Sequence, residues 1–169
     1  TEDFVTLLSG LEIADTTTLM FELYETVKQI SKTEAESFDD FSKWGQILLN
    51  DINEIDRYLV NASQLFGNLK DIKELEAWSL NNEEKLTDFQ KQYIHFWQSL
   101  KEYYFDFKER LLNKHLAYQG LAYKIVAANT EERVKNQTWK KIIFAGFNAL
   151  NKAEEQIIEN LLNCRKAEV

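Results

Sequence analysis

The sequence predicts a mainly α-helical protein, an irregular bundle of several helices with one short strand near the C-terminus. The first observation behind this fold class is the scarcity of helix breakers. The 169 residues include five glycines and no proline, whereas average usage would supply about eight prolines. The second is an aromatic content of 13% within 44% hydrophobic residues, which supplies a core and argues against disorder. The third is that apolar residues recur in steps of three and four, the period of a buried helix face.

The N-terminal half is predicted to hold five helices. The third of them would be capped by Ser37, with Asp39 and Asp40 placed favourably for the helix dipole. The expected helices span residues 2–9, 16–30, 38–59, 61–66 and 69–78, with Thr16 to Thr18 as candidate N-caps and Gly10 and Gly67 as breaks.

The longest helix follows and carries a continuous seam of large apolar residues, many of them aromatic. The seam consists of Leu86, Phe89, Tyr93, Phe96, Leu100, Tyr103, Phe107 and Leu111. Rings spaced in this way could form a base-stacking platform for single-stranded nucleic acid, which requires exposed rings. The seam positions instead favour a ring-filled bundle core.

The pattern changes towards the C-terminus. A helix over 117–128 is followed by a polar, loop-like stretch over 129–138 and then by a short basic and apolar run over 140–145. The β-branched residues of this run predict a buried strand, and Asn151 would cap a last helix over 152–164. A lone strand requires a sheet, so most of that sheet is expected to be missing. The chain therefore divides into residues 1–128 and residues 129–169.

The net charge of −8 is unevenly distributed along the chain. Residues 1–60 hold 13 acids and 4 bases, whereas residues 108–141 hold 8 bases and 3 acids. A basic stretch of this kind can contact phosphates, or it can be a solvated face that balances the acidic first third. The candidate DNA contacts are Lys108, Arg110, Lys114, Lys124, Arg133, Lys135, Lys140 and Lys141.

The motifs of common catalytic and metal sites are absent. The sequence contains no phosphate-binding P-loop, no G-x-G-x-x-G and no H-E-x-x-H. Neither His95 nor His115 has a glutamate three residues before it, so both are expected to be structural rather than metal ligands. We therefore expect no metal, no cofactor and no catalytic residue in this chain.

An acidic cluster lies near the end of the third predicted helix. Asp51, Glu54 and Asp56 lack the spacing and the glycine of an EF-hand loop. A solvated acidic face or an interhelix salt bridge fits them better than an ion site does.

The cysteine content and hydropathy predict a cytoplasmic protein without a membrane contact. Cys164 is the only cysteine, which rules out a disulfide framework within the chain. No apolar run approaches the ~18 residues of a membrane span, and no signal-peptide pattern opens the sequence.

Two stretches resemble AddB-like proteins, which combine an inactivated superfamily 1 helicase with a PD-(D/E)xK nuclease. From Phe41 to Leu59 the sequence follows F-x-x-W-G-x-x-L-L-x-D-x-x-x-I-D-x-Y-L. Nearer the start of the chain, the segment L-S-G-L-E-I-A-D at residues 8–15 also fits the family. The second stretch is L-A-Y-Q-G-L-A-Y at residues 116–123, followed by I-I-F-A-G-F-N-A-L at residues 142–150. The resemblance covers most of the chain and is weakest over residues 70–110.

The resemblance implies a helical 1B-like subdomain followed by the first strand of a RecA-like core. Active helicases of this superfamily end that strand in a Walker B motif, whose carboxylates hold magnesium and position the attacking water. Here the matching positions are Ala145 and Gly146, which can do neither. The resemblance thus implies that this chain does not hydrolyse ATP and is not an enzyme by itself, and that its parent protein is a nuclease.

For function, the resemblance implies a fragment that helps to hold or guide DNA near double-strand ends during repair. The expected partners are DNA, bound weakly and in the context of the full protein, the remainder of the same polypeptide, and a partner helicase–nuclease subunit. The alternative from a different class is a protein–protein interaction or scaffold module without DNA contact, whose acidic first third docks a basic partner.

Overall fold

The protein is mainly α-helical, as predicted, in a computed structural model that describes residues 2–31, 37–79, 88–146 and 149–168. Four strands of two residues each accompany the helices within these ranges. The helices are α1 (Glu2–Ser9), α2 (Thr16–Ser31), α3 (Phe38–Arg57), α4 (Ala62–Ser79), α5 (Asp88–Asn113), α6 (Gln119–Ala128), α7 (Thr130–Lys135) and α8 (Lys152–Asn163), and the strands are β1 (Glu12–Ile13), β2 (Leu116–Ala117), β3 (Ile142–Ile143) and β4 (Ala167–Glu168).

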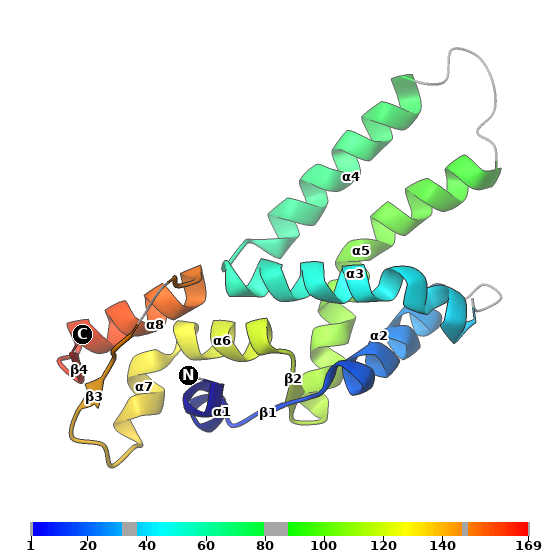
Figure 1. Cartoon of the computed structure of the whole chain (residues 1–169). Helices are drawn as coiled ribbons and strands as arrows, with labels where there is room; N and C mark the ends of the chain where they lie inside the picture. Colours follow the sequence, from blue (N-terminus) through cyan, green and yellow to red (C-terminus); the bar gives the residue numbers. More distant parts are fainter. Residues whose placement is uncertain (1, 32–36, 80–87, 147–148, 169) are drawn as a thin grey trace.

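The helices form a body from which one pair projects. In the body, α6 packs against α1, α3 and α8, while α2 packs against α3 and α5. Helices α4 and α5 contact each other along an arm that rises from the body (Figure 1). Within the described ranges, no helix is long and apolar enough to cross a lipid bilayer.

Side-chain caps fix the starts of two helices, as the sequence predicted. The Ser37 hydroxyl accepts a hydrogen bond from the backbone N–H of Asp40 and so caps α3. Asn151 and Glu154 form a reciprocal capping box at the start of α8. At α2, the cap is Asp15 rather than one of the three threonines, since its carboxylate accepts from the backbone N–H groups of Thr17 and Thr18.

The crossing of α3 and α6 is unusually close because it is built around a glycine. The Asn53 side-chain oxygen accepts a hydrogen bond of 2.7 Å from the backbone N–H of Gly120. A Cβ atom at Gly120 would lie 2.3 Å from the Asn53 carbonyl oxygen. No larger residue therefore fits at this crossing without moving the helices apart.

Two short parallel sheets join segments that are distant in the sequence. Strand β1 pairs with β2 in the register Glu12 to Leu116, and β3 pairs with β4 in the register Ile142 to Ala167. Helix α8 connects β3 to β4, so the C-terminal segment is a strand–helix–strand unit. The Ile143 side chain is 74% exposed beside this sheet.

Three sequence predictions were wrong in detail. The two helices expected around Gly67 are one helix, α4, because a glycine with a helical φ does not by itself end a helix. The loop expected over 129–138 contains α7, whose Val134 is buried in the core. The strand expected over 140–145 is limited to Ile142 and Ile143, and it is only partly buried, because Ile142 packs against the core while Ile143 is exposed.

The C-terminal half of the aromatic seam is part of the core, as predicted, whereas Phe96 is only partly buried. Leu100, Tyr103, Phe107 and Leu111 are all buried, and the ring of Phe107 stacks on Tyr118 with centroids 5.8 Å apart. Leu86 lies outside the described residues, as do the side chains of Phe89 and Tyr93.

Candidate functional site

Six of the eight candidate DNA contacts bind groups of the chain itself. Lys108 and Lys124 lie at a buried carboxylate between α3, α5 and α6. The other four that bind within the chain are Arg110, Lys114, Arg133 and Lys141, whereas Lys135 and Lys140 are exposed and make no ion pair among the described residues.

The buried carboxylate belongs to Asp56, which has no exposed surface. The hydroxyl groups of Tyr104 and Tyr118 each donate to it, at 2.5 Å to separate carboxylate oxygens. The Lys124 ammonium donates to the same carboxylate at 2.7 Å and to the Tyr104 oxygen at 3.2 Å. One of the two roles that the sequence suggested for this acidic cluster, an interhelix salt bridge, is therefore present at Asp56. We call Asp56, Tyr104, Tyr118 and Lys124 the Asp56 network.

The environment of the Asp56 network keeps its tyrosines protonated. Burial, and then the neighbouring Asp56 carboxylate, raise the pKa of both Tyr104 and Tyr118. Burial also lowers the pKa of Lys108, whose ammonium lies 5.3 Å from the centre of the Tyr104 ring, although the attraction of Asp56 opposes that shift. The network cross-links α3, α5 and α6. Because both carboxylate oxygens already accept hydrogen bonds and Asp56 is fully buried, no substrate can bind there.

Two further clamps use predicted DNA contacts. Glu22 of α2 accepts hydrogen bonds from Arg110 at 2.6 Å and from Lys114 at 2.5 Å. Burial would raise the pKa of Glu22, but these two cations more than offset it and lower the pKa. Arg133 donates to the carbonyl oxygens of Leu8 and Ser9 at the C-terminal end of α1, the end of a helix that favours a cation.

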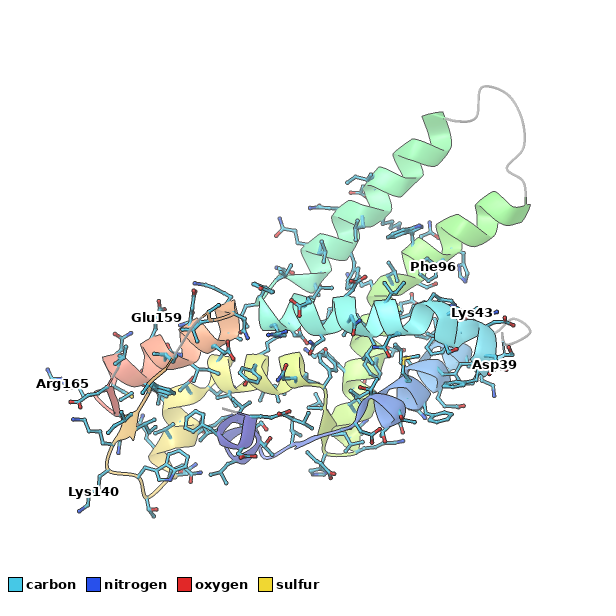
Figure 2. The ribbon with its side chains drawn as sticks, viewed as in Figure 1. Asp39, Lys43, Phe96, Lys140, Glu159 and Arg165 are labelled. Carbon is cyan, nitrogen blue, oxygen red and sulfur yellow. The ribbon has the colours of Figure 1, made fainter. Side chains whose placement is uncertain are left out.

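Several exposed bases lie near the C-terminal sheet, although others, such as Lys28 on α2 and Lys101 on α5, lie elsewhere. Lys140 and Arg165 project from the same end of the molecule in Figure 2. Lys141 forms an ion pair with Glu168 of β4. Arg165 was missed from the sequence, because it lies 24 positions beyond the basic stretch and is brought back only by the pairing of β3 with β4.

The positions that the sequence resemblance aligns with a Walker B motif come directly after β3. Ala145 and Gly146 are exposed at the carboxyl end of the strand, and Gly146 has a φ of +78° that suits glycine. Residues 147 and 148 of the same motif lie outside the described residues. Neither Ala145 nor Gly146 has a side chain that can ligate a cation.

The described side chains include no group of three or more carboxylate, histidine or cysteine residues that could hold a metal ion. His95 is exposed on α5, and His115 occupies the left-handed position after that helix, with a φ of +57°. Asp51 and Glu54 point away from buried Asp56 and line a cleft.

This cleft lies between α3, α4 and α5, has a volume of about 590 Å³ and is largely apolar. Buried Leu48, Ile52, Phe66 and Leu100 are among its lining residues. The other lining residues are Trp44, Ile47, Asp51, Glu54, Ile55, Tyr58, Val60, Leu65, Leu69, Phe96 and Trp97. The cleft could not be predicted from the sequence because it depends on how the α4–α5 arm packs on α3. The one local signal is that Ile47 and Tyr58 fall outside the apolar face that helical spacing gives this helix, which consists of Phe41, Trp44, Leu48, Ile52, Ile55 and Leu59.

Comparison of the chain with protein-family models, with curated proteins and with solved structures gave no match.

Proposed function

We propose that this chain is a non-catalytic helical part of a helicase–nuclease-like DNA repair protein, in which it helps to hold DNA near double-strand ends. The observation that carries the proposal is the β3–α8–β4 unit. It provides a parallel strand–helix–strand segment directly after the helical region, where the resemblance to AddB-like proteins expects the first strand of a RecA-like core.

The exposed side of this unit supports a larger sheet. Parallel sheets are normally covered on both faces and contain more than two strands. Here Ile143 is 74% exposed, and β3 and β4 are hydrogen-bonded only to each other among the described strands. The remainder of the same polypeptide would supply the missing strands, and a partner helicase–nuclease subunit would complete the assembly in the cytoplasm.

The proposed role is mechanical rather than catalytic. In an active helicase, carboxylates after this strand would hold magnesium and orient water for ATP hydrolysis. Ala145 and Gly146 stand at the matching positions, so we propose that this part of the protein does not hydrolyse ATP. The activity that we propose for the parent protein is that of a nuclease, which lies outside these residues.

The proposed DNA contacts are now fewer than the sequence indicated. Lys124, Lys114 and Arg133 are bound to Asp56, to Glu22 and to the end of α1. If one of them bound a phosphate instead, a carboxylate or carbonyl group of the chain would lose its hydrogen-bond partner, which is unfavourable. Lys135, Lys140 and Arg165 are exposed, and they are the better candidates for a phosphate track. Charge reversal of Lys124 would place a second carboxylate against buried Asp56 and disrupt the packing of the helices, so this substitution cannot test DNA contact.

The proposal is tested by measuring the fluorescence anisotropy of a labelled duplex with one blunt end, titrated with this chain between about 25 and about 200 mM salt. We expect saturable binding that weakens steeply as salt rises, because phosphate contacts release counterions. The double variant Lys135→Glu with Lys140→Glu should lower the slope of log K against log salt by about 1.8, if each lysine contacts one phosphate.

The matched control is Lys28→Glu with Lys101→Glu, which changes the net charge equally at exposed positions on α2 and α5. Its slope should stay at the wild-type value. An equal loss in both double variants would mean that only net charge matters, and absence of binding at low salt would remove DNA contact from the function.

A further inference from the structure

The outer side of α3 presents a stripe of side chains at the spacing of a helix–helix interface. Ile47, Asp51, Glu54 and Tyr58 follow one another in steps of four, three and four, so they lie on one side of the helix. All four line the cleft between α3, α4 and α5. The stripe is about 17 Å long at the rise of an α-helix, which corresponds to three turns of a docked helix.

The two ends of the stripe are apolar and exposed. Ile47 is 63% exposed and Tyr58 is 54% exposed. Deeper in the cleft, Trp44 packs edge-on against Phe96 with ring centroids 5.3 Å apart, which gives the cleft a rigid aromatic wall. Large apolar side chains from a partner would therefore find a preformed surface at each end.

The middle of the stripe is acidic. Asp51 is exposed and makes no ion pair within the described part of the chain. Glu54 accepts from Arg57 at 2.9 Å, but both side chains are substantially exposed, so that pair is weak and readily exchanged. An occupant that placed a cation between its two apolar anchors would match the stripe in both charge and spacing.

From this pattern we infer that the cleft is a docking site for a basic amphipathic helix of a partner protein, with large apolar residues at both ends of its contact face and Arg or Lys between them. Helix-in-groove recognition uses anchors at this spacing. The volume of about 590 Å³ suits a few side chains of a docked helix rather than a whole domain. This inference does not depend on DNA contact by Lys135 or Lys140.

A second copy of this chain fits the cleft poorly. A two-fold symmetric dimer brings the same patch of both subunits together. Asp51 and Glu54 would then face Asp51 and Glu54 of the other copy, which is a repulsive arrangement. The acidic residues that attract a basic helix thus select against self-association through the same face.

The test uses a fluorescent helical peptide of about 15 residues, the length that covers the stripe. The peptide is alanine-rich, with leucine at the two outer contact positions and arginine at the two inner ones, spaced in steps of four, three and four. Its partner probe carries glutamate in place of both arginines. We expect the arginine peptide to bind this chain with a micromolar Kd and the glutamate peptide to bind at least about tenfold more weakly.

Two variants locate the binding on the stripe. Asp51→Asn with Glu54→Gln should weaken the arginine peptide about tenfold and remove most of its preference over the glutamate peptide. Its matched control, Glu102→Gln with Asp106→Asn, removes two exposed charges from α5 and should leave Kd unchanged. Ile47→Ser should also raise Kd, whereas Leu7→Ser, at a comparably exposed position on α1, should not.

Since all substituted positions are exposed, these variants should fold as the wild type does, and circular dichroism checks this. Equal affinity for the two peptides, or equal losses in the stripe and control variants, would overturn the inference. A concentration-dependent dimer in analytical ultracentrifugation that Ile47→Ser abolishes would overturn the choice of occupant in favour of a second copy. Salt-dependent DNA binding is measured separately and does not change with these outcomes.

Discussion

Replacing Asp56 with asparagine tests whether the buried network holds the helices together. The carboxylate accepts from Tyr104, Tyr118 and Lys124, and it has no exposed surface. An asparagine side chain has the same shape, but it offers one acceptor oxygen and an amide group that donates. At least one tyrosine hydroxyl would then face a donor, and the Lys124 ammonium would lose its counterion.

The expected cost follows from these lost interactions. Hydrogen bonds to a charged group contribute about 1.5–3 kcal/mol each, and breaking a buried ion pair costs about 3–5 kcal/mol. Lys124 is 28% exposed, so water can solvate part of its ammonium and the ion-pair share is discounted. We therefore expect Asp56→Asn to lower the free energy of unfolding by about 3 kcal/mol.

The assay is urea unfolding followed by circular dichroism at constant pH. The midpoint should fall while the m-value is unchanged, because the same surface is exposed on unfolding. Asp51→Asn is the matched control on the exposed side of the same helix, and it should change stability by less than about 0.5 kcal/mol. A double-mutant cycle that combines Asp56→Asn with Lys124→Met should give a coupling energy of about 1–3 kcal/mol between the two residues.

An Asp56→Asn variant as stable as Asp51→Asn would refute this reasoning. It would mean that the network contributes no more than an exposed carboxylate does. Loss of stability without coupling to Lys124 would place the energy in the tyrosine hydrogen bonds instead.

Two further predictions concern pH and packing. Burial, and then the Asp56 carboxylate, raise the pKa of Tyr104 and Tyr118. The folded chain therefore keeps both hydroxyl protons, while the unfolded chain loses them near pH 10. The stability that these tyrosines contribute is thus fully present below about pH 10 and falls above it, by up to about 2.7 kcal/mol per pH unit. Urea midpoints between about pH 8 and about pH 11 should show this fall, Tyr104→Phe with Tyr118→Phe should flatten it, and a pH-independent wild type would contradict it. Gly120→Ala should cost about 1–3 kcal/mol because its Cβ would lie 2.3 Å from the Asn53 carbonyl oxygen, whereas Gly67→Ala, with nothing within 4 Å, should stabilise the chain by about 0.5–1 kcal/mol in the same unfolding assay. Equal effects of the two substitutions would show that α3 and α6 can separate freely.

The helices could be predicted from the sequence because their signals are local. Leu100, Tyr103, Phe107 and Leu111 repeat at the helical period, and they are buried as that period requires. The caps at Ser37 and Asn151 are likewise encoded within three residues of the helix starts. Strands of two residues carry no such periodicity, so β1, β2 and β4 could not be predicted.

The candidate site could not be read from charge counts because a count does not include partners. Lys124 and Asp56 are 68 positions apart, and Arg133 is 125 positions from the carbonyl of Leu8. Their pairing depends on how α6 and α7 pack on the rest of the body. The sequence did identify Asp56 as part of an acidic cluster with an interhelix salt bridge among its roles, but nothing local distinguished it from exposed Asp51.

The pairing of β1 with β2 has a consequence for synthesis on the ribosome. The backbone N–H groups of Glu12 and Ala14 donate to the carbonyl oxygens of His115 and Ala117, and α1 is held at its end by Arg133. These partners are translated more than a hundred residues later, which takes about 5–25 s at ~5–20 residues per second. During that interval α1 and β1 lack these contacts, so this part of the body cannot reach its final packing until α6 and α7 have been made.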